Sequence, residues 1–191
     1  MPALETKAKE LIFNTLSQSW AKSKHRRVVY HLKANDKILD IGAGKGALSW
    51  MLLEQGFDVT PVDVQNISFT EKVKPVIYDG ETLPFPDNSR DVGLFLTALH
   101  HTPDPEALIR EALRVCDRLI IIEDVYHGKA QKYATWFTDS LFNLEFKGHP
   151  HTNKNNFGWL KTFADLDLRV LHIEKEPVLG LFEQVTYYVT K

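Results

Sequence analysis

Short apolar stretches alternate with helix-like stretches along most of the chain after residue 36. The apolar stretches predict strands, and the helical spacing between them predicts helices over 46–55 and 105–115. The predicted strands cover residues 37–41, 58–63, 74–78, 91–97 and 118–123. Asp104 and Pro105 mark the start of the second helix, as a capping residue followed by a proline suited to the first turn. This alternation implies a parallel sheet with right-handed crossovers, so the pattern predicts an α/β fold.

The pattern changes after residue 125. A helix-like stretch over 129–144 leads into the polar loop 148–156, a helix over 157–165, and two strands over about 167–176 and 181–190. Pro177 and Gly180 lie in the short connection between these strands. Such a connection favours an antiparallel pair.

Residues 1–30 predict a helical arm. Apolar side chains recur there at helical spacing, at Leu4, Ala8, Leu11, Ile12, Leu16 and Trp20. This spacing is typical of an amphipathic helix packed on the main domain or over its functional site. The arm is also locally basic, with Lys7, Lys9, Lys22, Lys24, Arg26 and Arg27 against Glu5 and Glu10. A run of charge of this size is usually a solvated face.

The composition fits one domain over residues 1–191. The chain is 43% hydrophobic, enough for one substantial core but hardly for two. Its formal net charge of −2 gives no general affinity for nucleic acids or anionic membranes. Cys116 is the only cysteine, so an internal disulfide is excluded. Because an apolar run of membrane-spanning length and a signal-peptide core are both absent, we expect a soluble, cytoplasmic protein.

Residues 38–46 carry the strongest chemical signal: an apolar strand, then an acid, then glycines at alternate positions. Glycines let backbone N–H groups approach a ligand, and the helix that follows directs its positive end to the same place. The glycines alone also fit a dinucleotide site, through Gly42, Gly44 and Ala47. Asp40 distinguishes the two, because its carboxylate would repel a pyrophosphate but attract an ammonium group.

With Asp40 included, this segment resembles the first motif of the Rossmann-like S-adenosylmethionine-dependent methyltransferases, Asp/Glu-x-Gly-x-Gly-x-Gly. The order of predicted elements is also similar to that fold over about residues 30–190. The resemblance implies a doubly wound, seven-stranded, mostly parallel sheet whose last strand is antiparallel. Its motifs look most like the small-molecule group that includes the quinone-biosynthesis methyltransferases.

The resemblance also implies roles for acids at the next two strand ends. Asp63 would accept hydrogen bonds from the ribose hydroxyls, with Val64 beside it, although a dehydrogenase would place an acid similarly. Asp79 would bind the adenine amino group, and Gly80 would leave room for the ring. The stretch 83–91, Leu-Pro-Phe-Pro-Asp-Asn-Ser-Arg-Asp, closely resembles the family's Leu-Pro-Phe-Pro-Asp-x-Ser-Phe-Asp.

Residues 97–105, Thr-Ala-Leu-His-His-Thr-Pro-Asp-Pro, resemble the family's sequence at the fourth strand end, which borders the transferred methyl group. His100 or His101 would serve as a base if the acceptor must lose a proton, and we expect His100 to face the cofactor. The cofactor-binding residues implied by the resemblance are Asp40, Gly42, Ala43, Gly44, Gly46, Asp63, Val64, Asp79, Gly80 and Thr97. For the cofactor's carboxylate, spacing does not distinguish among Arg26, Arg27, Tyr30 and Lys45.

The acceptor side has weaker signals. Glu123 and Asp124 stand at the end of the fifth strand, where they would contact substrate or cap the backbone. The segment 126–158 is the least family-like and is predicted to cover the acceptor pocket. Its His149-Pro150-His151 lacks further clustered ligands, so we expect no metal site.

We therefore predict an S-adenosylmethionine-dependent methyltransferase acting on oxygen, nitrogen or carbon of a small molecule. A non-catalytic cofactor-binding protein, or a subunit that needs a partner, is the alternative. RNA methylation is less well supported, because the Asn/Asp-Pro-Pro-aromatic motif of amino-directed base methylation is absent where Thr97-Ala98-Leu99-His100 stands. A dehydrogenase is disfavoured by Asp40 and by a length that leaves little room for a substrate domain.

Overall fold

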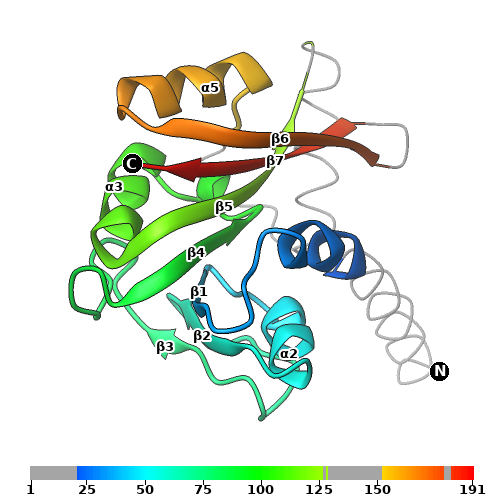
Figure 1. Ribbon diagram of the computed structural model, residues 1–191, viewed down its shortest axis with the longest axis vertical. Coiled ribbons are helices and arrows are strands. Elements are labelled where there is room, and N and C mark those ends of the chain that lie inside the picture. Colours follow the sequence, from blue (N-terminus) through cyan, green and yellow to red (C-terminus); the bar gives the residue numbers. More distant parts are fainter. Residues whose placement is uncertain (1–20, 127, 129–151, 179–181) are drawn as a thin grey trace, which may run out of the picture.

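The computed structural model describes residues 21–126, 128, 152–178 and 182–191. A seven-stranded sheet with the order β3-β2-β1-β4-β5-β7-β6 runs through the molecule (Figure 1). Its strands are β1 (Lys37–Ile41), β2 (Asp58–Asp63), β3 (Val76–Ile77), β4 (Arg90–Leu96), β5 (Cys116–Val125), β6 (Arg169–Val178) and β7 (Phe182–Thr190). β7 lies antiparallel to both β5 and β6, whereas the other pairs are parallel. The predicted sheet, including its antiparallel last strand, is therefore confirmed.

Helices cover both faces of this sheet. They are α2 (Ala47–Glu54), the short 3-10 turn η1 (Leu99–His101), α3 (Pro105–Val115) and α5 (Asn156–Asp165), and residues 21–29 are also helical. α3 and α5 pack on one face, with Leu119 and Ile121 of β5, and α2 and the helix 21–29 pack on the other, with Ile120 and Ile122. Because both faces are covered, the centre of β5 is the continuous apolar run Leu119–Ile122 rather than an alternating pattern.

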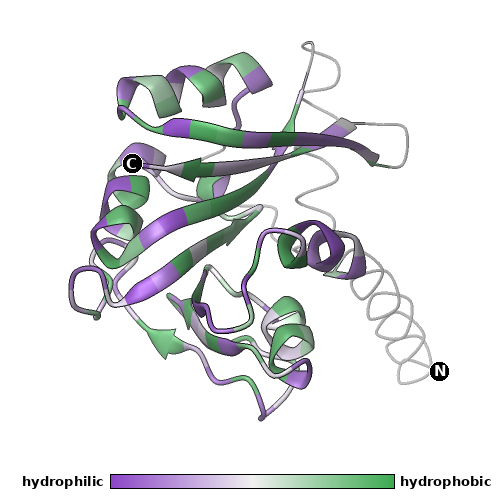
Figure 2. Ribbon diagram, in the orientation of Figure 1, coloured by the Kyte–Doolittle hydropathy of each residue, from purple (hydrophilic) through white to green (hydrophobic). Residues whose placement is uncertain are grey.

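The helices carry the pattern expected of elements with one buried face. Figure 2 shows α3 and α5 with both hydrophobic and hydrophilic bands. In α3 the buried side chains include Leu108, Ile109, Ala112 and Leu113, which recur at helical spacing. Asp104 caps this helix by accepting a hydrogen bond from the Ala107 N–H (2.9 Å), as the sequence predicted.

Differences between predicted and observed bounds have local causes. α2 begins at Ala47 because Gly46 takes a left-handed conformation (φ 75°). β5 begins at Cys116, directly after α3, because Cys116 is already extended. β6 begins two residues later than predicted, since Asp167 adopts a positive φ of 55° after α5. The predicted arm helix up to residue 20, the helix over 129–144 and the loop residues 148–151 lie outside the described residues.

The helix 21–29 is anchored to the sheet by Arg27, whose side chain is almost fully buried. Its guanidinium donates to Gln184 Oε1 (2.7 Å) and Thr186 Oγ1 (3.3 Å) on β7 and pairs with Glu176 on β6 (3.3 Å). Gln184 in turn donates to Asp124 Oδ1 at the end of β5 (2.8 Å). This part of the predicted arm therefore packs on the domain. No helix among the described residues is long and apolar enough to cross a membrane.

Candidate active site

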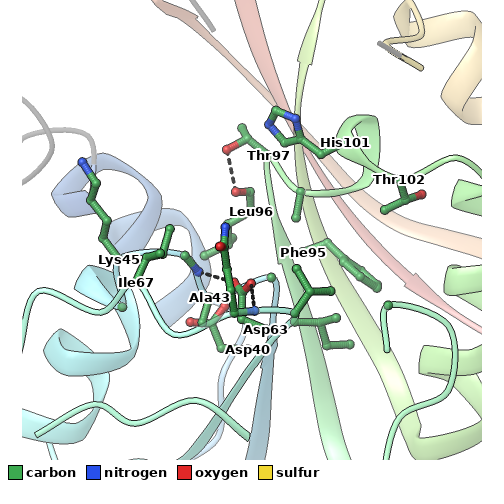
Figure 3. A pocket seen from close by; sticks show the side chains of 18 of the residues that line it. Asp40, Ala43, Lys45, Asp63, Ile67, Phe95, Leu96, Thr97, His101 and Thr102 are labelled. Carbon is green, nitrogen blue, oxygen red and sulfur yellow. Dashed lines mark hydrogen bonds between the residues drawn. The ribbon is translucent and has the colours of Figure 1, made fainter. Parts of the chain in front are cut away.

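A cavity of about 600 Å³ lies at the carboxyl ends of the parallel strands (Figure 3). Such edges are where ligands bind in open α/β sheets, near the point at which the strand order reverses. Residues 40–48, 63–65, 78–81, 95–98 and 101–103 line most of it, together with Ala21, Lys24, Ile67 and Leu108. The cavity thus gathers all ten predicted cofactor-binding residues and His101, but not His100.

The glycine loop, residues 42–46, connects β1 directly to α2. The N–H groups of Gly42 and Ala43 donate to the Val62 carbonyl oxygen (2.9 and 3.1 Å), so the loop is fixed against β2. Gly42 has a positive φ of 74°, and a Cβ atom there would lie 2.8 Å from the Cβ of Ala98. Glycine is therefore required at this position both by conformation and by space.

Asp63 links this loop to the second strand. Its Oδ2 accepts a hydrogen bond from the Gly44 N–H (2.7 Å), and its Oδ1 lies 3.3 Å from the Gln65 N–H. The side chain lines the cavity at the end of β2, where a ligand hydroxyl would meet it. These bonds leave acceptor capacity on a carboxylate, which has about four lone-pair positions.

Asp40 is a buried acid at the floor of the glycine loop. Its side chain accepts a hydrogen bond from the Ser49 hydroxyl (2.6 Å), and the residue is 2% exposed. Burial raises the pKa of Asp40 to about 6, and the nearby Asp63 adds to this, while Ser49 and Lys24 act in the opposite direction. A cation bound here would favour the charged carboxylate. Ser49 lies in the first turn of α2, and the predicted site residues did not include it.

Asp79 and Gly80 form the outer wall of the cavity. One oxygen of Asp79 accepts hydrogen bonds from the N–H groups of Thr82 (2.7 Å) and Glu81 (2.8 Å). These bonds lower the pKa of Asp79, so the exposed carboxylate is held charged and in a fixed orientation. Gly80 (φ 87°) lies close to Val64, whose Cγ1 would be 3.3 Å from an added Cβ atom.

Thr97 occupies the end of β4 in a strained conformation. Its φ is 58°, which is rare for a β-branched residue, and its N–H donates to the Ile122 carbonyl (2.6 Å). Lys24 Nζ donates to Thr97 Oγ1 (2.7 Å), so the helix 21–29 reaches this strand end. From its charge pattern the basic arm is expected to be a solvated face, and Lys24 is not among the predicted site residues.

The two adjacent histidines have different environments, and His100, which was expected to face the cofactor, does not line the cavity. His100 is fully buried, with Nδ1 2.6 Å from Glu123 Oε2. The other oxygen of Glu123 accepts the N–H groups of Ala98 (3.1 Å) and Leu99 (2.9 Å), which open the η1 turn. His101 lines the cavity instead (Figure 3), and its ring centroid lies 4.1 Å from that of the buried His100.

The other residues considered from sequence differ in whether they line the cavity. Glu123 is fully buried in the His100 pair and Asp124 bonds Gln184, and neither lines the cavity. Arg26 and Arg27 pair with Glu176. Tyr30 is 80% exposed, away from the cavity lining, and Lys45 lines it. His149 and His151 lie outside the described residues.

The strand order, the antiparallel β7 and the glycine loop after β1 define a Rossmann-like methyltransferase fold. A chain of the solved complex between a Haloferax volcanii methyltransferase activator and a methyltransferase has the same fold, with a TM-score of 0.72 and 15% identity. That alignment covers 93% of this chain and 91% of the solved one.

Residues 39–118 match the family described as "Methyltransferase domain". 27-O-demethylrifamycin SV methyltransferase of Amycolatopsis mediterranei is 33% identical over 97 residues, covering 44% of this chain and 36% of the relative. Demethylmenaquinone methyltransferase of Paenarthrobacter aurescens is 29% identical over 125 residues, covering 60% and 49%. The matches thus span half or less of these relatives. The resemblance drawn from the motifs is confirmed.

Proposed function

We propose that the protein binds S-adenosylmethionine and transfers its methyl group to an oxygen, nitrogen or carbon atom of a small molecule. One observation carries the proposal: the carboxylates of Asp40, Asp63 and Asp79 line a single cavity around a glycine loop. An acidic site of this kind favours a ligand with an ammonium group and several hydrogen-bond donors. Such a site disfavours the pyrophosphate of a dinucleotide, so it does not support the dehydrogenase alternative.

Each part of the cofactor has a partner in this arrangement. Asp40 would hold the α-ammonium group, because the incoming positive charge offsets the cost of burying its carboxylate. Asp63 would accept the ribose hydroxyls, with Gly44 fixing its orientation. Asp79 would accept the adenine amino group, and Val64 and Gly80 would flank the ring. The cofactor, when bound, supplies an electrophilic methyl group on a sulfonium centre.

The protein's part in the transfer is alignment and proton removal. Holding the two reacting atoms in line is worth several kcal/mol of barrier by analogy with intramolecular reactions. His101, in the cavity wall beside Thr97, would take the proton of an acceptor that must lose one. Its partner in the turn, His100, would act only by fixing the backbone through Glu123. His101→Gln should therefore slow turnover while the Kd for the cofactor stays within about threefold.

The acceptor would approach from the side of residues 126–158. The described end of this segment already contacts the η1 turn: the Thr152 N–H donates to the His100 carbonyl (3.2 Å) and its hydroxyl to the Thr102 carbonyl (3.2 Å). Small molecules are the favoured acceptors, because two relatives are named for demethylrifamycin and demethylmenaquinone.

The first experiment is a calorimetric titration with S-adenosylmethionine and S-adenosylhomocysteine, with NAD as the control. We expect both adenosyl ligands to bind with micromolar Kd values and NAD not to bind. If none of the three ligands binds, the proposal is contradicted. Release of S-adenosylhomocysteine that depends on an added acceptor would then establish catalysis. Binding without turnover across an acceptor panel would favour a non-catalytic or partner-dependent protein, in line with the matched fold found in complex with an activator. Transfer of a labelled methyl group from S-adenosylmethionine to RNA would instead identify the protein as an RNA methyltransferase.

A further inference from the structure

Two lysines supply positive charge to the cavity among the residues the structure describes. Lys24 comes from the helix 21–29 and Lys45 from the glycine loop. The two arginines near the first motif face elsewhere, since both Arg26 and Arg27 pair with Glu176 on β6. An anionic group on a ligand in this cavity therefore has two candidate partners in the described part of the chain.

Lys24 is held in place at the end of β4. Its Nζ donates to Thr97 Oγ1 (2.7 Å) and lies 3.5 Å from the Leu96 carbonyl oxygen, which fixes the ammonium group at the end of β4. The helix that carries it is itself anchored by the buried Arg27, three residues further along. An ordered cation of this kind loses little side-chain entropy when it binds a ligand.

Three acidic side chains and one arginine act electrostatically on Lys24. Asp124, Glu123 and Asp40 attract its ammonium group, and Arg27 repels it. Burial outweighs the attraction and lowers the pKa of Lys24. A bound anion would favour the charged form of the ammonium group.

The geometry of the cofactor decides between the two lysines. Its α-ammonium and carboxylate groups are attached to the same carbon, so their protein partners must lie side by side. Lys24 interacts electrostatically with Asp40, the acid assigned to the ammonium group. The side chain of Lys45, in contrast, extends away from Asp40 and Asp63 (Figure 3).

We infer that Lys24 binds the carboxylate of the cofactor's amino acid end, beside Asp40, so that the helix 21–29 completes the cofactor site. This inference rests on the proposed function. It extends the site beyond the parallel sheet and gives the basic arm a specific role. Lys24 is thereby a cofactor-binding residue that discriminates between adenosyl ligands with and without a carboxylate.

The test compares two ligands that differ only in that group, S-adenosylmethionine and its decarboxylated form. The wild-type protein should bind S-adenosylmethionine about tenfold more tightly, which corresponds to about 1.4 kcal/mol. Lys24→Met should abolish this preference. Lys24→Gln, which keeps a donor for the Thr97 hydroxyl, should abolish it too. Lys45→Met is the matched control, because it removes a lysine from the same cavity and should leave the preference intact.

The ratio of the two Kd values is the deciding quantity, since a partly damaged fold weakens both ligands together. A preference that survives in both Lys24 variants would overturn the inference. So would a preference lost in Lys45→Met, or one absent from the wild-type protein. Methylthioadenosine, which lacks the amino acid end, separates this inference from the proposed function. If it and both other ligands fail to bind the wild type, the proposed function itself is wrong.

Discussion

The carboxylate of Glu123 holds the imidazole of His100 at 2.6 Å in the protein interior. The pair joins the end of β5 to the η1 turn after β4, and the second carboxylate oxygen accepts two backbone N–H groups of that turn. Three hydrogen bonds therefore converge on one buried side chain. Because the turn presents His101 and follows Thr97, this pair sets the geometry of the wall where methyl transfer is proposed.

Removal of the Glu123 carboxylate should destabilise the protein severely. Glu123→Ala leaves His100 and two N–H groups buried without their acceptor, so we expect the free energy of unfolding to fall by about 3 kcal/mol or more. Urea denaturation followed by circular dichroism measures this change. Glu71→Ala is the control, because its side chain is 97% exposed and should change stability by less than about 0.5 kcal/mol. Equal changes in the free energy of unfolding for the two variants would show that the Glu123–His100 pair does not stabilise the fold.

Gly42 and Gly56 form a matched pair for testing the glycine loop. Both have a positive φ, 74° and 85°, but an added Cβ atom meets Ala98 at 2.8 Å in Gly42→Ala and nothing within 4 Å in Gly56→Ala. We expect Gly56→Ala to cost about 1–2 kcal/mol from backbone strain alone. Gly42→Ala should cost about 1–3 kcal/mol more from overpacking, and it should weaken cofactor binding. Similar unfolding midpoints for the two variants would contradict the predicted clash.

Asp63→Ala should weaken S-adenosylmethionine binding by about 1–3 kcal/mol, the cost of leaving hydrogen-bonding groups without their partner. Titration calorimetry of the purified variant gives the Kd directly. Asp58→Ala provides the comparison, since Asp58 is exposed at the opposite end of the same strand. It should leave the Kd unchanged. An unaltered Kd in Asp63→Ala would remove the ribose assignment.

Asp40 should make cofactor binding depend on pH. Its folded-state pKa is raised from 3.8 to about 6, so between these values the folded protein binds more protons than the unfolded chain. The free energy of unfolding contributed by this group is therefore lost as the pH rises from about 4 through 6. The α-ammonium group needs the charged carboxylate, and about a tenth of Asp40 is charged at pH 5, so affinity should rise about tenfold between pH 5 and 7.

The pH dependence has two controls. Methylthioadenosine lacks the ammonium group, so its affinity should stay flat over the same range. Asp40→Asn should also flatten the curve for S-adenosylmethionine, at a lower affinity. A curve for Asp40→Asn that keeps the full slope would assign the titration to another group, such as a histidine.

Most of the sheet and the acidic side of the site could be predicted from sequence because their signals are local. Strands β1 and β2 have the predicted bounds, and Asp40, Asp63 and Asp79 lie at or just beyond the carboxyl ends of β1, β2 and β3. When parallel strands pair in the expected order, their carboxyl ends meet at one edge. No long-range information beyond the strand order is needed to bring these acids together.

The histidines and Lys24 could not be predicted because distant contacts decide their directions. His100 is the histidine buried in the protein interior because it pairs with Glu123, which lies 23 residues further along the chain. Which face of the helix 21–29 meets the cavity depends on Arg27 binding Gln184, across 157 residues. Periodicity identifies an apolar face, but it does not say what lies opposite a particular lysine.

The position of β7 between β5 and β6 has a consequence for how the chain acquires its fold. Until residues 182–190 have been synthesised, the edge of β5 that runs from Arg118 to Val125 has no partner, and β6 has no neighbour through which to join the sheet. An open edge with three consecutive isoleucines is prone to associate with other chains. We expect nascent chains to rely on protection at this edge, and the sheet to close only when the final strand arrives.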